Sequence, residues 1–409
     1  METQKWVYLF SQDQTEGKKE LKNLLGGKGA NLAEMASLKC PVPPGFTITT
    51  EVCTYYYNNN FNYPQSLEKQ VKEHVKKIEK ILLKQFGSVD DPLLVSVRSG
   101  SSVSMPGMMD TILNLGLNEQ TVVGLAKKTN NPQFAFDSYR RFIQMFGDVV
   151  KNIPSEKFEH ALESVKSIRH VQKDNDLSES ELKELILMYQ HIYKKETGKE
   201  FPQDVYEQMW LAIGAVFKSW NNERAKTYRN IHGISHDLGT AVNIQSMVFG
   251  NMGDTSATGV AFTRDPSTGE KRFFGEYLIN AQGEDVVAGI RTPFSINGNN
   301  QSLEMIMPNI YSELHSYADM LESHFKDMQD IEFTIQDGKL WLLQTRSGKR
   351  TAKAAIKIAT DLVKENVIDK KTAVLRVTPE QVDQLLHPSI GNSVKKEIIA
   401  KGLPASPGA

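Results

Sequence analysis

Apolar residues in the first part of the chain gather in short runs that predict strands. The runs in PVPPGFTITT (41–50) and DPLLVSVRSG (91–100) are bounded by Pro, Gly or Ser, as is typical of strands that end in turns. A Gly-rich stretch at 26–29 precedes a helix-like segment. We therefore expect residues 1–117 to form the N-terminal part of a first α/β lobe.

Between residues 118 and 202 the apolar positions change to a spacing of three or four residues. By this spacing Tyr139 and Phe142 share one face of a helix. Ser178 and Glu181 have the spacing of a capping box, which predicts the start of another helix. The pattern indicates a helical insertion over 118–202.

The remaining chain returns to the first lobe and then enters a second one. A helix from Asp204 to about Tyr228, within 203–240, carries apolar residues at core spacing. Strand-like runs from TAVNIQSMVFGN onward predict a second α/β lobe of mostly antiparallel strands over 241–350. Residues 351–409 should be helical and should end in a linker, LPASPGA.

The segment DMQDIEFTIQDGKLWLLQTR (327–346) predicts an amphipathic β-hairpin. Ile331 and Phe333 alternate with Asp330 and Glu332, so one side of the first strand is apolar and the other is polar. The polar side suits a metal-bound polyphosphate, because it combines carboxylates, an amide and a guanidinium. Taken alone, the hairpin is explained equally well by a solvated polar face.

The turn of this hairpin decides which side chains share a face. Residues 336–338 suit a three-residue loop with a bulge, because the glycine can adopt a positive φ. A two-residue turn would place Gln344 on the apolar face, where an amide without partners costs about 1–3 kcal/mol. We therefore expect the longer turn. Its predicted pairs are Phe333 with Trp341, Ile331 with Leu343, and Asp330 with Gln344.

Charge and composition exclude several kinds of protein. Lys and Arg number 48 against 49 Asp and Glu, so no net field attracts nucleic acid or an anionic membrane. Two cysteines, Cys40 and Cys53, are too few for a disulfide framework and fit a reducing cytosol. The sequence contains no run of about 18 apolar residues. We expect a cytoplasmic protein without nucleic-acid or membrane partners.

Two cations lie beside flexible segments that could approach a phosphate. Lys28 stands in LLGGKG before a helix-like stretch, where free backbone N–H groups favour anions. Arg98 ends an apolar run before SGSS, and a guanidinium fork suits phosphate oxygens. For the Lys28 segment an ordinary glycine turn is the commoner explanation, and for Arg98 a structural ion pair explains the pattern equally well. The loop GDTSATG (253–259) suits closure over phosphates, but a plain hairpin tip is slightly favoured.

Further carboxylates lie on or just after a strand of the second lobe, in GEYLINAQGED. These are Glu276, Glu284 and Asp285. If they converge with Asp330 and Glu332, they repel one another unless magnesium or a cationic side chain neutralises them. None of the nine histidines has the spacing of a metal site, and no Ser-His-Asp arrangement is legible.

Several long segments together resemble the pyruvate, phosphate dikinase family. They include NLLGGKGANLAEM, DPLLVSVRSGS, SMPGMMDTILNLGLN, GDTSATGVAFTRDPSTGE and DMQDIEFTIQDGKLWLLQTRSGKRT, and the resemblance runs along essentially the whole chain. It implies an ATP-grasp fold, in which two α/β lobes clamp ATP with Mg²⁺. In the family, ATP phosphorylates a histidine on a separate domain through its β-phosphoryl group, with the participation of inorganic phosphate. That histidine then phosphorylates pyruvate.

The resemblance implies a role for each matching residue. Lys28 and Arg98 would hold phosphates from the first lobe, and Arg346 would face the transferring phosphoryl group. The remaining implied contacts are Asp330, Glu332 and Gln344 to Mg²⁺ and ATP, Glu276, Glu284 and Asp285 at further polar positions of the cleft, and the backbone of Gln245, Met247 and Val248 to adenine.

The phosphocarrier histidine of the family lies beyond a linker similar to LPASPGA, where this chain ends. We therefore expect the chain to bind Mg-ATP without completing the reaction, and we expect the full-length enzyme to be a homodimer. Two alternatives remain open. One is a phosphoenolpyruvate synthase-like enzyme that uses water in place of phosphate, and the other is a non-catalytic nucleotide-binding module.

Overall fold

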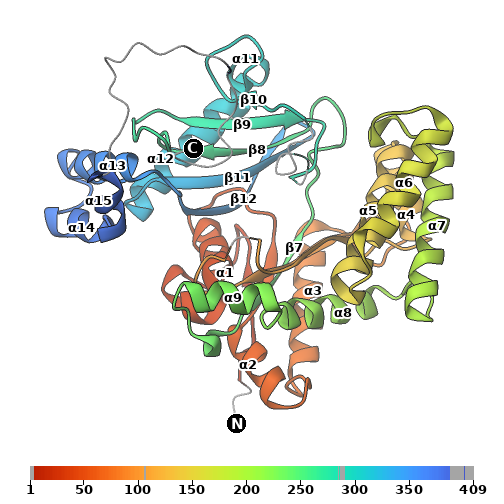
Figure 1. The fold of residues 1–409 in the computed structure, drawn as a ribbon. Helices are drawn as coiled ribbons and strands as arrows, with labels where there is room; N and C mark the ends of the chain where they lie inside the picture. Colours follow the sequence, from red (N-terminus) through yellow and green to blue (C-terminus); the bar gives the residue numbers. More distant parts are fainter. Residues whose placement is uncertain (1–3, 106, 284, 286–290, 387–399, 401–409) are drawn as a thin grey trace. The chain divides into compact units, whose positions relative to one another are not determined.

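The chain folds into two compact units, residues 1–248 and 249–409, each with its own β-sheet (Figure 1). The computed structural model describes residues 4–105, 107–283, 285, 291–386 and 400. The predicted mixed α/β class is confirmed, because both units combine an antiparallel sheet with helices.

Unit 1 is built on a five-stranded antiparallel sheet in the order β1-β2-β7-β5-β6. The helices α1, α2 and α8 all contact the central strand β7, which is therefore buried along its whole length. The strands are β1 (Val7–Phe10), β2 (Gly45–Ile48), β5 (Val95–Gly100), β6 (Thr111–Leu115) and β7 (Ala241–Ser246), with β3 (Gln85–Phe86) and β4 (Pro92–Leu93) as a separate parallel pair.

The helices of unit 1 comprise those around the sheet and those of the predicted insertion. The first group is α1 (Lys22–Ser37), α2 (Thr50–Asn58), α3 (Leu67–Leu82), α8 (Val205–Ser219) and α9 (Glu223–Ile231). The insertion contains α4 (Thr121–Thr129), α5 (Pro132–Lys151), α6 (Ser155–Arg169) and α7 (Glu179–Thr197). The short 3₁₀ segments are Lys19–Leu21, Asp174–Asp176 and His236–Leu238.

Two details of the helical prediction have clear outcomes. The capping box at Ser178 and Glu181 is confirmed at the start of α7. The single helix expected from Asp204 to about Tyr228 is wrong, because α8 ends at Ser219 and α9 begins at Glu223. Asn222 accepts a hydrogen bond from the Ala225 N–H and so caps a new helix at the break.

The strand at Ala241–Ser246 lies in a different sheet from the one predicted. We expected it to open the second lobe at residue 241, but β7 pairs with β2 and β5 and forms the centre of the unit 1 sheet. The division between the units falls after residue 248. A buried strand gives the same apolar run in either sheet, so the sequence pattern alone could not assign its partners.

Unit 2 is built on a second antiparallel sheet in the order β10-β9-β8-β11-β12. The helix α12 (Pro308–Phe325) contacts β11 and β12 and covers their apolar face. The strands are β8 (Ala257–Phe262), β9 (Phe274–Ile279), β10 (Phe294–Ser295), β11 (Gln329–Gln336) and β12 (Lys339–Ser347), and the other helices are α11 (Leu303–Ile306), α13 (Ala352–Lys364), α14 (Lys370–Arg376) and α15 (Pro379–Leu386).

The predicted three-residue turn of the β11–β12 hairpin is wrong. Gln336 pairs with Lys339, so Asp337 and Gly338 alone form the turn, and both have positive φ, at 49° and 71°. A bulge within β12 at Leu343 then shifts the register between Glu332 and Phe333. The observed pairs replace those predicted: Phe333 with Leu342, Thr334 with Trp341, Ile331 with Thr345, Glu332 with Gln344, and Asp330 with Arg346.

A buried guanidinium ties three elements of unit 2 together. Arg264, which follows β8, is fully buried and donates to Glu322 of α12 at 2.7 and 3.0 Å. The same guanidinium donates to Glu365, just after α13, at 2.9 and 3.1 Å. This bidentate network joins the sheet to two helices.

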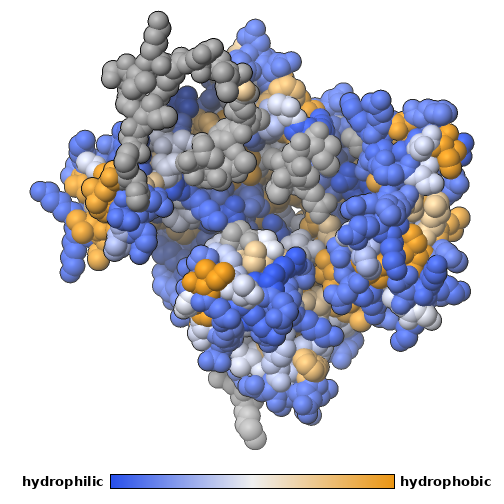
Figure 2. All heavy atoms as spheres, viewed as in Figure 1, coloured by the Kyte–Doolittle hydropathy of each residue, from blue (hydrophilic) through white to orange (hydrophobic). Residues whose placement is uncertain are grey.

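Most of the visible surface is hydrophilic, with apolar side chains gathered over α14 and α15 (Figure 2). Val374, Leu375 and Leu386 are 74–78 % exposed. Cys40 and Cys53 are buried free thiols, and burial raises the pKa of each to about 12. Among the described residues, no helix combines the length and apolar character that crossing a membrane requires.

The Arg264 network predicts a large effect of one substitution. Arg264→Met should lower the free energy of unfolding by about 3–5 kcal/mol, because it leaves the buried Glu322 carboxylate without its cation. Urea unfolding followed by circular dichroism measures this change.

The matched control is Lys271→Met. The Lys271 ammonium also pairs with Glu365 at 2.9 Å, but its side chain is 60 % exposed. Its loss should cost about 0–1 kcal/mol. Equal effects of the two substitutions would contradict a stabilising role for the buried network.

Candidate functional site

The bulge in β12 gathers polar side chains on one face of the unit 2 sheet. Residues that pair across antiparallel strands point to the same face. Glu332 pairs with Gln344 on one side and with Val260 on the other, and Val260 pairs with Glu276. Three polar groups from β9, β11 and β12 therefore lie in a single row. The adjacent row places Asp330 beside Arg346.

One guanidinium lies against two carboxylates of this face. Arg346 Nε donates to Asp330 Oδ2 at 2.7 Å, and Arg346 Nη2 lies 3.7 Å from Glu332 Oε1. The Arg346 side chain remains 41 % exposed, whereas the Asp330 side chain is 6 % exposed. The guanidinium thus covers the carboxylates from the solvent side of the face.

Asp330 retains one carboxylate oxygen without a partner. Oδ1 is buried and has no hydrogen-bond partner among the described residues. Burial raises the pKa of Asp330 above its ordinary value, although Arg346 opposes the shift. Burial also raises the pKa of Glu276 in the neighbouring row. A cation at Oδ1 would offset this cost of desolvation.

The other predicted carboxylates have different outcomes. Asp285 accepts a hydrogen bond from the Gln282 N–H at 2.8 Å. Glu284 lies outside the described residues. Glu276 shares the polar face of β11 and β12 through its pairing with Val260.

The chemistry of this face fits magnesium held partly by another ligand. The described residues contain no group of three or more His, Cys, Asp or Glu side chains that could hold a metal alone. Magnesium commonly uses one or two carboxylates and takes its other ligands from water and phosphates. Asp330 Oδ1 and the neighbouring Glu332 and Gln344 meet that requirement.

In unit 1, glycines bring the segment of Lys28 close to the end of β5. Gly26 interrupts α1 with φ 68° and ψ 166°, and a Cβ there would lie 1.8 Å from the Gly100 carbonyl oxygen. The Gly27 N–H donates to the Ser101 carbonyl at 2.8 Å. Lys28 therefore lies beside Gly100 and Ser101, which follow Arg98 in the chain.

Arg98 lies on β5 of the unit 1 sheet, in a row of paired residues that includes a polar side chain that was not predicted. It pairs with Thr111 on β6 and with Asn243 on β7, and Asn243 pairs with Thr47 on β2. Asn243 was not predicted as a functional residue. Its signal in the sequence was an amide, one of two with Gln245, within the buried run of β7.

The backbone contacts predicted for adenine are partly engaged within unit 1. Gln245 lies inside the sheet, with Gly45 and Ser96 as neighbours on either side. The Met247 N–H donates to the Leu94 carbonyl at 2.9 Å. The prediction therefore depends on the Met247 carbonyl and on Val248.

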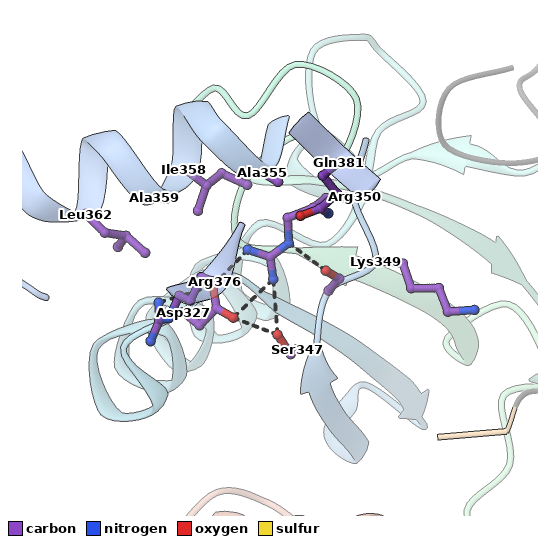
Figure 3. Close-up of a pocket in the computed structure, with 11 residues that line it drawn as sticks. Asp327, Ser347, Lys349, Arg350, Ala355, Ile358, Ala359, Leu362, Arg376 and Gln381 are labelled. Carbon is purple, nitrogen blue, oxygen red and sulfur yellow. Dashed lines mark hydrogen bonds and ion pairs between the residues drawn. The ribbon is translucent and has the colours of Figure 1, made fainter. Parts of the chain in front are cut away.

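A cavity of about 680 Å³ lies at the base of the hairpin, beside α13 (Figure 3). Arg350 donates to both oxygens of Asp327, at 2.8 and 3.1 Å, and Arg376 lies 3.5 Å from the same carboxylate. These groups satisfy one another, and Lys349 points away from them (Figure 3). We interpret the cluster as a structural connection between the hairpin and the C-terminal helices.

Comparison with known proteins gives one consistent result. A family model described as pyruvate phosphate dikinase, AMP/ATP-binding domain, matches residues 22–63, 59–318 and 306–367. Similar proteins include pyruvate, phosphate dikinase of Rhizobium meliloti (strain 1021), 54 % identical over 413 residues, and that of Clostridium symbiosum, 55 % identical over 408 residues. A chloroplastic relative from Arabidopsis thaliana is 53 % identical over 408 residues.

The chain spans less than half the length of these curated relatives. Each alignment covers 99 % of this chain but only 46 % of the two bacterial proteins and 42 % of the Arabidopsis protein.

The burial of Asp330 predicts a pH effect with a defined sign. A carboxyl whose pKa is raised by folding favours the folded state at low pH, and this contribution is lost as pH rises through the raised pKa. Asp330→Asn should therefore remove part of the decline in stability that accompanies Asp330 ionisation. Urea unfolding between pH 3 and 7 measures the difference from the unaltered chain.

Arg346→Met should strengthen the pH dependence of stability that Asp330→Asn weakens. Without the guanidinium the pKa of Asp330 should rise further, because Arg346 is the main group that lowers it. A carboxyl titration followed by ¹³C NMR would contradict this account if the pKa of Asp330 fell or stayed the same in the variant.

Proposed function

Because the chain belongs to the pyruvate phosphate dikinase AMP/ATP-binding domain family, we propose that it binds Mg-ATP as the phosphoryl donor of a dikinase. The complete reaction converts ATP, pyruvate and phosphate to AMP, phosphoenolpyruvate and pyrophosphate. The observation that carries the proposal is the buried, unpartnered Oδ1 of Asp330 on a face shared with Glu332 and Gln344. A cation-binding oxygen at this position suits a nucleotide bound together with magnesium.

The residues of this face have complementary tasks in the proposal. Asp330 and Glu332 hold the metal, and Gln344 contributes an amide oxygen or an N–H to the metal or the nucleotide. Magnesium, when bound, neutralises and orients the phosphates. Arg346 keeps Nε on Asp330 and presents its other N–H groups to the transferring phosphoryl oxygens, since its side chain is partly exposed.

Lys28 and Arg98 are proposed to hold phosphates from unit 1. Phosphoryl transfer depends mainly on positioning and on neutralisation of charge, so cations are its essential protein groups. The close approach of the Gly26 segment to the loop after Arg98 supports a shared anion site in this unit. We further propose that the two units correspond to the two lobes of an ATP-grasp fold.

The wider setting of the reaction is also a proposal. The phosphoryl acceptor is a histidine on a separate domain, phosphate is the second acceptor, and the full-length enzyme is a homodimer. We propose a cytoplasmic location for this protein, although similar proteins include some named as chloroplastic.

As domain limits we propose 1–117 and 203–240 for the first lobe, 118–202 for the insertion, and 351–409 for the helical connection. We move the start of the second lobe from residue 241 to 249, where the units divide.

Isothermal titration with Mg-ATP tests the assigned site. The unaltered chain should bind, and Glu332→Ala should weaken binding by about 10–100-fold, because a group that holds the metal is lost. Asp319→Ala, which removes an exposed carboxylate of α12, is the control and should leave the affinity unchanged. Equal affinities of the unaltered chain and Glu332→Ala would exclude this site.

Transfer to a histidine domain supplied separately tests the chemistry. With ATP labelled at the β-phosphate and the phosphohistidine domain of a relative, the label should appear on histidine. Arg346→Met should slow the labelling by about 10²–10³-fold, because a donor to the developing charge is removed. Lys364→Met, an exposed cation, is the control. A parallel reaction uses ATP labelled at the γ-phosphate. Histidine that is labelled by this ATP and not by the β-labelled ATP would contradict the proposed reaction.

A further inference from the structure

A single buried amide lies where the two cation-bearing segments of unit 1 meet. Asn243 occupies the central strand β7 and is fully buried. Arg98 is its paired neighbour on β5, and Thr47 is its paired neighbour on β2. The side chain of Asn243 therefore lies on the same face of the sheet as the Arg98 side chain.

Two glycines fit around this amide. A Cβ at Gly29 would lie 2.8 Å from Asn243 Oδ1, and a Cβ at Gly100 would lie 2.6 Å from Asn243 Nδ2. Neither position tolerates a side chain without movement of its neighbours. Lys28 directly precedes Gly29, and its Cβ would be 3.4 Å from a Cβ at Gly100. The Asn243 amide thus packs against both the helical turn that contains Lys28 and the end of β5, the strand that contains Arg98.

The stability of the fold does not explain why an amide occupies this position. Asn243 Oδ1 accepts a hydrogen bond from Thr47 Oγ1 at 2.8 Å, but Nδ2 has no partner among the described residues. A buried donor without a partner destabilises the folded state, whereas apolar groups in place of both members of a hydrogen-bonded pair leave no polar atom unpaired.

We propose that Asn243 is a positioning residue that sets the separation of Lys28 and Arg98. The inference rests on the proposed function, in which both cations hold phosphates. An amide is flat, and its nitrogen and oxygen allow closer approach of the glycines than methyl groups do. Methyl groups need carbon contacts of about 3.5–4.0 Å. In place of the amide they would push Gly29 and Gly100 apart and displace both cations.

The double variant Thr47→Val/Asn243→Leu tests this role. It replaces both members of the hydrogen bond by apolar groups, so no buried polar atom is left unpaired, and urea unfolding should show a folded chain with a modest loss of stability from the displaced glycines. The dissociation constant for Mg-ATP should rise at least about tenfold, since small displacements of positioning groups have large effects. The dissociation constant for AMP, which lacks the outer phosphates, should change less than about twofold.

Two single variants complete the experiment. Thr47→Val alone keeps the amide and should keep the affinity for Mg-ATP. Gly29→Ala places a methyl group 2.7 Å from Thr47 Oγ1 and 2.8 Å from Asn243 Oδ1, the two members of the hydrogen bond. It should reproduce the selective loss of ATP affinity, so the role can still be tested if the double variant does not fold.

The outcomes separate this role from the proposed function. Equal losses of ATP and AMP affinity, or unchanged ATP affinity in the folded double variant and in Gly29→Ala, would overturn the role of Asn243 alone. Failure of the unaltered chain to bind either nucleotide would overturn the proposed function and this inference with it.

Discussion

The chemistry of unit 2 depends on the two-residue period of the β-strand. Successive side chains of β12 point to opposite faces, so one additional residue reverses every position beyond it. The bulge at Leu343 supplies that residue and brings Gln344 and Arg346 onto the face of Glu332 and Asp330. On the other face, Leu340 and Leu342 are nearly fully buried beside Ile331 and Phe333. One local irregularity therefore separates an apolar core from a polar site.

The polar site leaves part of its negative charge without a cation. Arg346 sets one positive charge against the carboxylates of Asp330 and Glu332, and it leaves one buried oxygen of Asp330 without a partner. This arrangement raises the pKa of Asp330 and is unfavourable for folding at neutral pH. Sites that bind charged ligands often retain groups that lower the stability of the unliganded fold, because the ligand supplies the missing interaction. Asn243 in unit 1 presents a comparable case with a donor instead of an acceptor.

The sequence predicted element types better than their partners. Alternation identified β11 and β12, and helical spacing identified α5 and α7, because these signals depend only on which side of an element is buried. The turn of the hairpin was mispredicted because the sequence does not show where a bulge lies. We assumed that the bulge belonged to the turn, and it lies five residues beyond Gly338.

The candidate site was predicted to a similar extent. Residue types near Asp330 and Arg346 pointed to phosphate and metal chemistry, but their pairing with each other could not be read from spacing. The role proposed for Asn243 was not predicted, because that role rests on its contacts with Gly29 and Gly100, which lie far from it in the sequence. Contacts of this kind become visible only when the sheet order is known.

The place of β7 in the unit 1 sheet has a consequence for folding during synthesis. Residues 241–246 separate β2 from β5, so both of these strands have an unpaired edge until β7 has been synthesised. Contacts between such distant segments form slowly, and open strand edges promote association between chains. A nascent chain that stalls before β7 would lack the central strand of its first sheet and would be a substrate for chaperones.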